Sequence, residues 1–201
     1  IIEDAAESLG SFRCAQHTGR VGLAGVLSFN GNKIITTGGG GALITDDELL
    51  AKRAKHLTTT AKQSHPWFFH HDEVGFNYRM PNLNAALGLA QIAQLEDFVT
   101  KKRNLASCYS EWFELWPEVT FFMEPTSARS NFWLNAILLP DRDARDEFLH
   151  RTNEFGIMTR PMWTPMNTQP MYQSCQQFNL DNAGAIENTL VNIPSSVVSI
   201  K

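Results

Sequence analysis

One lysine stands out because it lies between an apolar run and four consecutive glycines. Lys33 follows the run that ends at Phe29 and precedes Gly38–Gly41. It is either a solvated loop lysine, as most lysines are, or an amine that becomes nucleophilic once its ammonium form is desolvated. The glycines permit positive φ angles and close backbone approach, so neighbouring amides and hydroxyls could hold a phosphate. Because the lysine precedes the glycines, the Walker A order is absent, which disfavours nucleotide hydrolysis by that route.

A carboxylate near the start of the sequence could complement this amine. Asp4 follows the strand-like pair Ile1-Ile2, and a carboxylate at the end of a buried strand needs a partner that offsets its desolvation. A protonated pyridine nitrogen would be such a partner, and pyridoxal phosphate enzymes pair an acid with that nitrogen and a lysine with the aldehyde. The alternative is that Asp4 caps a helix that begins at Ala5.

The elements that must position these residues are those of an α/β layer. We expect buried strands at 21–29 and 41–45, and a helix after Asp46-Asp47-Glu48, where acidic residues suit the helix dipole. A polar and aromatic loop follows over residues 61–80. Apolar residues at three- and four-residue spacing then predict one long helix from near Asn82 until Pro117 stops it.

The second half of the sequence predicts a small α+β unit. Strands are expected at 119–123, 132–139 and 157–160, and a helix at 141–155, with Gly156 as its C′ residue. A Pro-containing loop covers 161–170.

Composition excludes several classes of protein. With 201 residues, 43% hydrophobic and 19% charged, and a net charge of −4, the sequence is typical of a globular protein rather than a disordered one. No apolar stretch is long enough for a membrane span, and the acidic balance gives no support for nucleic-acid binding.

Three widely spaced cysteines, Cys14, Cys108 and Cys175, form no CxxC pair. We expect them to be buried or partly buried free thiols in a reducing cytoplasm. His65, His70 and His71 lie beside two acidic residues, but adjacent loop histidines do not easily converge on one ion, so no metal site is expected. The opening residues read as the end of a strand without an initiator Met or a signal peptide, so we expect a piece of a longer protein.

Three motifs together resemble one family. They are Glu3-Asp4-Ala5-Ala6-Glu7-Ser8, then Ser28-Phe29-x-x-x-Lys33-x-x-Thr36-Thr37-Gly38-x-Gly40-Gly41, then Gly75-Phe76-Asn77-Tyr78-Arg79-Met80. In this order and spacing they are similar to the pyridoxal-phosphate-dependent sugar-nucleotide aminotransferases of the DegT/DnrJ/EryC1/StrS type. The resemblance extends over essentially the whole sequence, and it favours the functional interpretation of both Lys33 and Asp4.

The resemblance implies roles for five residues. Lys33 matches the lysine that bonds the cofactor aldehyde and later moves a proton between substrate carbons. Asp4 matches the acid on the pyridinium nitrogen, and Ser28 matches a hydroxyl that binds the cofactor phosphate. Asn77 matches an asparagine that reaches the phosphate in the neighbouring subunit, which implies a homodimer with shared active sites. Arg79, beside it, is either a substrate-binding residue or part of a structural salt bridge.

Two further positions are less defined. The family commonly has Gln or His where Glu7 stands, a position that contacts the ring hydroxyl, and two anionic oxygens there would repel one another. Arg160 stands where the family's small domain borders the active site. It could bind the carboxylate of the donor or a substrate phosphate, or it could form a surface ion pair.

The resemblance therefore implies an α/β fold of the aspartate-aminotransferase type (fold type I): a partial large domain and a small C-terminal α+β domain. Residues 1–95 would be the C-terminal part of the cofactor domain, and 96–201 a linking helix with the small domain. Gly39 in the glycine motif and Asn30-Gly31-Asn32 before the lysine resemble a subgroup from bacillosamine and legionaminic acid synthesis.

The implied reaction moves an amino group from L-glutamate to C4 of a nucleotide-linked 4-keto-6-deoxy (N-acetyl)hexosamine in a cytoplasmic enzyme of surface-polysaccharide synthesis. The family's N-terminal half, which supplies the residue that stacks on the cofactor ring, has no counterpart in this sequence. The alternative is therefore an inactive fragment that folds and oligomerises but binds pyridoxal phosphate weakly.

Overall fold

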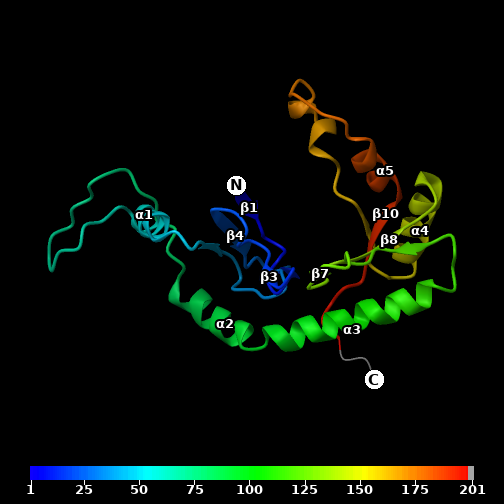
Figure 1. Ribbon diagram of the computed structural model, residues 1–201, viewed down its shortest axis with the longest axis horizontal. Helices are drawn as coiled ribbons and strands as arrows, with labels where there is room; N and C mark the ends of the chain where they lie inside the picture. Colours follow the sequence, from blue (N-terminus) through cyan, green and yellow to red (C-terminus); the bar gives the residue numbers. More distant parts are fainter. Residues whose placement is uncertain (199–201) are drawn as a thin grey trace. The chain divides into compact units, whose positions relative to one another are not determined.

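The computed structural model describes residues 1–198, in which five strands are followed by three helices and then by a mixture of strands and helices (Figure 1). It divides into two compact units. The first contains residues 1–99 together with Pro125–Asn131, and the second contains Thr100–Glu124 together with the chain from Phe132 onward. Residues 199–201 of the predicted small domain lie outside the described residues, and a functional boundary at residue 95 stays a prediction.

A three-stranded sheet lies at the centre of the first unit. Its order is β1 (Ile2–Asp4), β4 (Ala24–Ser28) and β5 (Gly41–Ile44), with β1 parallel and β5 antiparallel to β4. The sequence predicted all three strands, but β4 begins later than expected. The amides of Val21 and Gly22 donate to the Glu3 carboxylate at 2.6 and 2.5 Å, which keeps them out of the ladder. These bonds lower the pKa of Glu3.

A small second sheet in this unit was not predicted. It has the order β3 (Gln16–His17), β2 (Phe12–Arg13) and β7 (Ala128–Arg129), and both pairings are antiparallel. Cys14 and Ala15 form its two-residue turn with φ of 48° and 64°, the left-handed combination that matches the twist of a hairpin. Strands of two residues carry no periodic signal, which explains why sequence reasoning missed them.

Helix α1 (Glu48–Thr58) begins where the acidic run predicted it. Asp47 is its N-cap and accepts from the amides of Leu49 and Leu50 at 2.9 and 3.0 Å. The predicted loop follows, and Figure 1 shows it running out from α1 and back to α2. Two isolated antiparallel bridges, Thr59 with Asn77 and Lys62 with His71, join its outgoing and returning arms.

The single long helix expected after Asn82 is wrong, because the structure has two helices. They are α2 (Asn82–Ile92) and α3 (Leu95–Phe113). Between them, the backbone amide of Gln94 donates to the Gln91 carbonyl, three residues back, rather than to the Ala90 carbonyl, four residues back. The side-chain amide of Gln94 donates to the Ala90 carbonyl instead, at 2.9 Å. The side chain therefore replaces the backbone donor that would have continued α2.

The second unit is built on a four-stranded sheet of order β6-β8-β10-β9. The strands are β6 (Thr120–Phe121), β8 (Asn135–Leu138), β9 (Arg160–Pro161) and β10 (Leu190–Ile193). All three pairings are antiparallel. Strand β10 lies inside this sheet and was not predicted, although its apolar run before Pro194 gave a signal. Strand β9 is shorter and later than the expected 157–160.

One apolar core stabilises this unit. Its buried members come from α3, β6, β8, β10 and the residues that flank β8: Ala106, Phe113, Phe121, Phe132, Ile137, Leu139, Val191 and Ile193. Helix α4 (Arg142–Glu154) packs Phe148 and Leu149 against it. As predicted, Gly156 follows α4 with a left-handed φ of 76°.

The remaining described elements were not predicted. They are the short turns η1 (Met166–Thr168) and η2 (Pro170–Tyr172), and helix α5 (Asp181–Thr189). Within residues 1–198, no helix combines the length and the apolarity that crossing a bilayer requires.

The three cysteines are free but exposed, which corrects the expectation of buried thiols. Cys14 lies in a hairpin turn, Cys108 on α3 and Cys175 after η2. None of these positions contributes to the apolar core.

Candidate functional site

The parallel pairing of β1 with β4 brings two predicted site residues to the same edge of the sheet. Asp4 is the last residue of β1 and pairs with Val26, so β4 ends two residues further along, at Ser28. Ligands of open α/β sheets bind beyond the carboxyl ends of parallel strands. The antiparallel β5 starts at this edge with Gly41, which pairs with Ser28.

Neither Asp4 nor Ser28, the two polar residues at this edge, caps a helix. Asp4 Oδ1 accepts from the Ala6 amide at 3.2 Å, but residues 5–10 form turns, so the helix-cap alternative is wrong. Ser28 Oγ accepts from the Asn30 amide at 3.3 Å. Since Asp4 is exposed, its carboxylate is accessible to a ligand.

Lys33 lies in the turn that follows β4, and its side chain is only 11% exposed. Ile34 and Ile35, both buried, anchor the backbone just after it. Its Nζ donates to Glu7 Oε1 at 2.5 Å, which excludes the freely solvated loop lysine. Within this chain, Glu7 forms an ion pair with the lysine.

The glycine run closes a compact loop on Phe29. The Phe29 amide donates to the Gly40 carbonyl, and the Thr37 amide donates to the Phe29 carbonyl, each at 3.0 Å. Gly38 and Gly40 have φ of 78° and 94°, and a Cβ on Gly41 would lie 2.3 Å from the Leu27 carbonyl oxygen. Glycine is therefore required at all three positions.

A second group of predicted residues lines a pocket of about 610 Å³ in the same unit. Asn77 and Arg79 lie on one wall, and the backbone of Gly39–Gly41 forms another. Asn84 also lines the pocket, and its side-chain amide donates to the Thr37 carbonyl, which attaches α2 to the glycine loop. Asp4, Glu7, Ser28 and Lys33 are not among its lining residues.

Arg160 lies in the second unit, at the start of β9. Its Nη1 donates to Asn153 Oδ1 at 3.1 Å and to the Thr159 carbonyl at 2.8 Å. The guanidinium is exposed, and among the described residues it bonds these two neutral oxygens and no carboxylate, which disfavours the surface ion pair that was one of the two alternatives.

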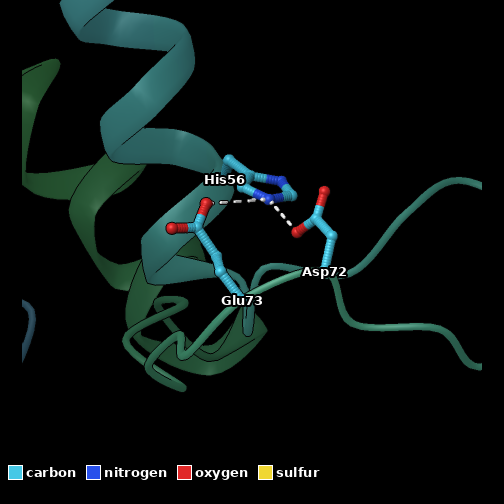
Figure 2. Close-up of side chains that lie close together, drawn as sticks. All are labelled: His56, Asp72 and Glu73. Carbon is cyan, nitrogen blue, oxygen red and sulfur yellow. Dashed lines mark hydrogen bonds and ion pairs between the residues drawn. The ribbon is translucent and has the colours of Figure 1, made fainter.

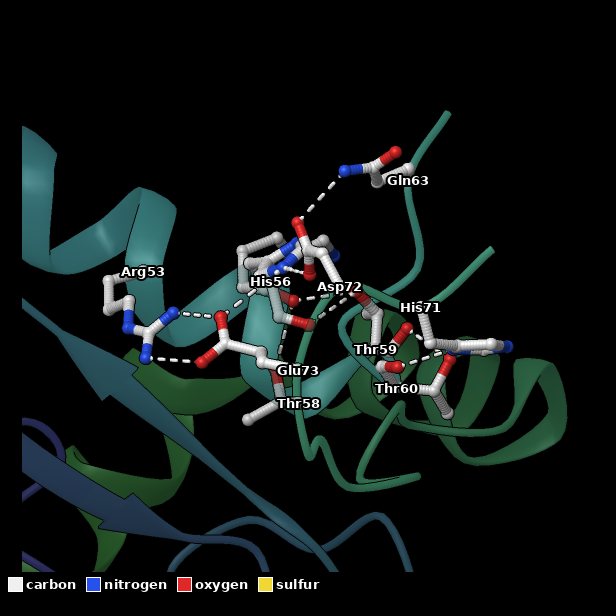
Figure 3. Close-up of polar contacts among 10 residues, drawn as sticks. Arg53, His56, Thr58, Thr59, Thr60, Gln63, His71, Asp72 and Glu73 are labelled. Atoms are coloured by element: carbon white, nitrogen blue, oxygen red, sulfur yellow. Dashed lines mark hydrogen bonds and ion pairs between the residues drawn. The ribbon is translucent and has the colours of Figure 1, made fainter. Parts of the chain in front are cut away.

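A polar cluster that sequence reasoning did not assemble joins α1 to the returning arm of the loop (Figures 2 and 3). Its members are Arg53, His56, Asp72 and Glu73, which we call the α1 clasp. His56 Nε2 lies 2.7 Å from Asp72 Oδ1 and 3.5 Å from Glu73 Oε1, and the Arg53 guanidinium binds both Glu73 oxygens. Arg53 and His56 are three residues apart on one helix face, a spacing that could have suggested a shared partner.

The donor set at the sheet edge fits pyridoxal phosphate. An amine, a carboxylate and a hydroxyl, those of Lys33, Asp4 and Ser28, gather around strand ends and a glycine loop. These are the groups that an aldehyde, a pyridinium nitrogen and a phosphate require.

Comparison with solved structures defines the class of fold as that of the sugar aminotransferases. The aminotransferase TlmJ from Streptoalloteichus hindustanus superimposes with a TM-score of 0.90 at 25% identity, over 98% of this chain and 53% of that one. This confirms the predicted fold of the aspartate-aminotransferase type. The chain belongs to the DegT/DnrJ/EryC1/StrS aminotransferase family, whose model matches residues 1–198.

Two relatives illustrate the similarity. EpsN of Bacillus subtilis (strain 168), provisionally described as a pyridoxal phosphate-dependent aminotransferase, is 36% identical over 186 residues, which are 92% of this chain and 48% of EpsN. The GDP-perosamine synthase of Escherichia coli O157:H7 is 36% identical over 177 residues, 88% of this chain and 48% of the synthase. The chain thus spans about half the length of these relatives.

Proposed function

We propose that the chain carries the reactive amine and several cofactor-holding residues of a pyridoxal-phosphate-dependent sugar-nucleotide aminotransferase. The enzyme moves an amino group from L-glutamate to C4 of a nucleotide-linked 4-keto-6-deoxy (N-acetyl)hexosamine for surface polysaccharides. The observation that carries the proposal is Lys33, a shielded lysine at the sheet edge that Asp4 and Ser28 share. Membership of the aminotransferase family supports it.

Each residue at the edge has a role that its position allows. When bound, pyridoxal phosphate supplies an electron sink and carries the amino group. Lys33 Nζ would hold the cofactor through its aldehyde, with release of water, and would hold or move a proton, while Glu7, 2.5 Å away, would orient the amine. The Asp4 carboxylate would keep the pyridine nitrogen protonated. Ser28 Oγ and the amides of the glycine loop would hold the phosphate.

Asn77 and Arg79 act on a second subunit in this proposal. Both are exposed at the rim of the 610 Å³ pocket, where they could reach a phosphate bound by a neighbouring copy. Helix α2 supports a homodimer, because its sequence Asn82–Ile92 carries no charged side chain and exposes Leu83 and Leu89. An uncharged helix with a wide apolar surface is normally covered by another part of the protein or by a partner.

The substrates follow from the relatives and from one arginine. A relative named for GDP-perosamine synthesis supports a nucleotide-linked sugar, and the exposed Arg160 is suited to the carboxylate of L-glutamate or to a substrate phosphate. Three free cysteines support a reducing cytoplasmic location.

The test is a visible absorption spectrum of the chain with added pyridoxal 5′-phosphate, before and after borohydride reduction. We expect a band that borohydride removes, with the reduced adduct mapped to Lys33. Lys33→Ala should abolish it. Lys52→Ala is the matched control, because Lys52 also pairs with a carboxylate, Glu48, at 3.3 Å but is exposed. A band that survives in Lys33→Ala would refute the assignment.

A second candidate is the inactive fragment, which folds and self-associates but binds the cofactor weakly. Ile2, Val26 and Leu43 are exposed on the sheet that carries the site, and exposed apolar surface promotes association. Sedimentation velocity together with the same titration separates the candidates. Oligomers that show no lysine-dependent band would favour the fragment.

A further inference from the structure

The chain leaves α1 through a strained turn. Thr60 and Ala61 have φ of 69° and 49°, a left-handed conformation that is rare for residues other than glycine, especially for a β-branched threonine. Such strain persists only where surrounding contacts over-determine the backbone, and it is concentrated at functional sites. The contacts that hold this turn in its strained conformation therefore indicate which part of the chain the turn positions.

The returning arm of the loop supplies the first set of contacts. The Phe76 amide donates to the Leu57 carbonyl at 2.7 Å, the Thr60 amide to the Phe76 carbonyl at 3.0 Å, and the Tyr78 amide to the Thr58 carbonyl at 2.9 Å. Gly75 crosses the turn so closely that a Cβ would lie 2.5 Å from backbone atoms of Thr60 and Ala61.

The α1 clasp supplies the second set, directly before Gly75. Arg53 donates to Glu73 from both terminal guanidinium nitrogens, and Nη2 lies 2.6 Å from Oε2. His56 Nε2 holds Asp72, and the Gln63 side chain donates to the other Asp72 oxygen at 3.2 Å. Figure 3 shows these contacts converging from the last turns of α1 and both loop arms. His71 adds a bond from Nδ1 to the Thr60 carbonyl at 2.7 Å.

The clasp is an ionic contact rather than a cation site. Hydrogen bonding by His56 and Gln63 lowers the pKa of Asp72, and hydrogen bonding by Arg53 lowers the pKa of Glu73, so both are carboxylates at neutral pH. The ligand atoms of His56, Asp72 and Glu73 lie within 4.8 Å of one another. The Arg53 guanidinium already neutralises Glu73, and its charge would repel a metal ion.

We propose that the α1 clasp is a positioning device for the site residues that follow it. It fixes residues 72–73 against α1, only four residues before Asn77, and so sets Asn77 and Arg79 on the wall of the pocket they line with the glycine loop. Asp72 and Glu73 are positioning residues. The inference rests on the proposed function only for what Asn77 and Arg79 bind.

The first test measures amide hydrogen exchange at Phe76 and Tyr78 in Glu73→Gln. We expect exchange about fivefold faster, since a bidentate pair in a network lies at the upper end of surface ion pairs. Because Arg53 and Glu73 act as one contact, the double variant Arg53→Gln/Glu73→Gln should be no faster than Glu73→Gln. Glu48→Gln is the matched control, as it breaks a one-to-one pair on the same helix. Unchanged exchange in Glu73→Gln, or faster exchange throughout residues 1–99, would overturn the proposal.

The second test titrates the same variants with pyridoxal 5′-phosphate. We expect the half-saturation concentration to rise about threefold in Glu73→Gln, while the absorption maximum stays unchanged. In the control Glu48→Gln, the half-saturation concentration should equal that of the parent chain. Faster exchange with unaltered affinity would overturn the link to the site. If the parent chain binds no cofactor, the proposed function fails for this chain, and the exchange measurement alone then decides whether the clasp positions residues 76–78.

Discussion

The two compact units contain similar numbers of residues but differ in how much large apolar surface they bury. The second unit closes a four-stranded sheet over a core of large side chains such as Phe113, Ile137 and Val191. The first carries the candidate site, and its buried apolar side chains include the small Ala5, Ala24 and Ala61, while many large apolar side chains are exposed. The unit that holds the candidate site relies on glycines, left-handed turns and ion pairs, which set positions but contribute little burial.

The largest expected difference between the units concerns core truncation. Ile137 is 0% exposed at the centre of the second unit, so Ile137→Ala should lower the free energy of unfolding by about 2–5 kcal/mol. Leu43→Ala, on the half-exposed sheet of the first unit, should cost much less. Denaturant titrations followed by far-ultraviolet circular dichroism measure both. Equal losses would show that the first unit has an equivalent core.

Lys102 gives the second unit a second distinguishing property, a stability that depends on pH. It is buried, donates to the carbonyls of Trp133 and Ser195, and desolvation lowers its pKa from 10.5 to about 8. The unfolded chain then binds more protons between these values, so stability should rise by roughly 1–3 kcal/mol from pH 8 towards pH 10.

Denaturant midpoints across this range check the prediction for Lys102, and Lys102→Met should remove the slope. The upper limit is pH 10 because burial raises the pKa of Tyr109 above 10.0, and that residue contributes the opposite slope beyond it. A flat profile in the parent chain would contradict the burial argument.

Two helix glycines offer a matched pair across the units. Gly184 in α5 has open space at its Cβ position, whereas a Cβ on Gly88 in α2 would lie 2.9 Å from Thr37 Cγ2. Gly184→Ala should raise stability by about 0.5–1 kcal/mol through helix propensity. Gly88→Ala should lose that gain, and roughly 1 kcal/mol more, because it displaces the glycine loop. Thermal denaturation compares them, and a stabilising Gly88→Ala would show that the loop yields easily.

The smallest difference is expected at the helix caps. Asp47 caps α1 in the first unit, and Asp141 caps α4 in the second by accepting from the Ala144 amide at 2.9 Å. Each substitution by Ala should cost about 0.5–1 kcal/mol. If thermal denaturation shows similar losses at the two caps, the units differ in their packing and not in their helix ends. A much larger loss at one cap would show that they differ in local structure.

The sequence predicted most clearly those features that depend on neighbouring residues. The starts of α1 and α4, the left-handed Gly156 and the strands before and after the glycine loop all follow from local chemistry, whereas the capping roles of Asp47 and Asp141 emerged only in the structure. At the break after α2, the Gln94 side chain donates to the carbonyl that a backbone amide would bond if the helix continued. Periodicity cannot detect such a competition.

The site was predicted as separate residues rather than as an arrangement. Motif spacing identified Asp4, Ser28 and Lys33, and the parallel pairing of β1 with β4 explains why two of them share an edge. The contact of Glu7 with Lys33, and of Arg53 with Glu73, joins residues far apart in the sequence. Only the fold specifies such pairs, and the roles of Asp4, Glu7, Ser28, Lys33, Asn77, Arg79 and Arg160 stay predictions until the variants are measured.

The interior place of β10 has a consequence for synthesis on the ribosome. Strands β8 and β9 pair with β10 and not with each other, so this sheet stays in two pieces until residue 193 has emerged from the exit tunnel. The edges of β8 and β9 that pair with β10 therefore stay unpaired for the time that translation of some thirty further residues takes, on the order of seconds. During that interval the nascent second unit is exposed to chaperones and to misassociation, despite having the stronger core once complete.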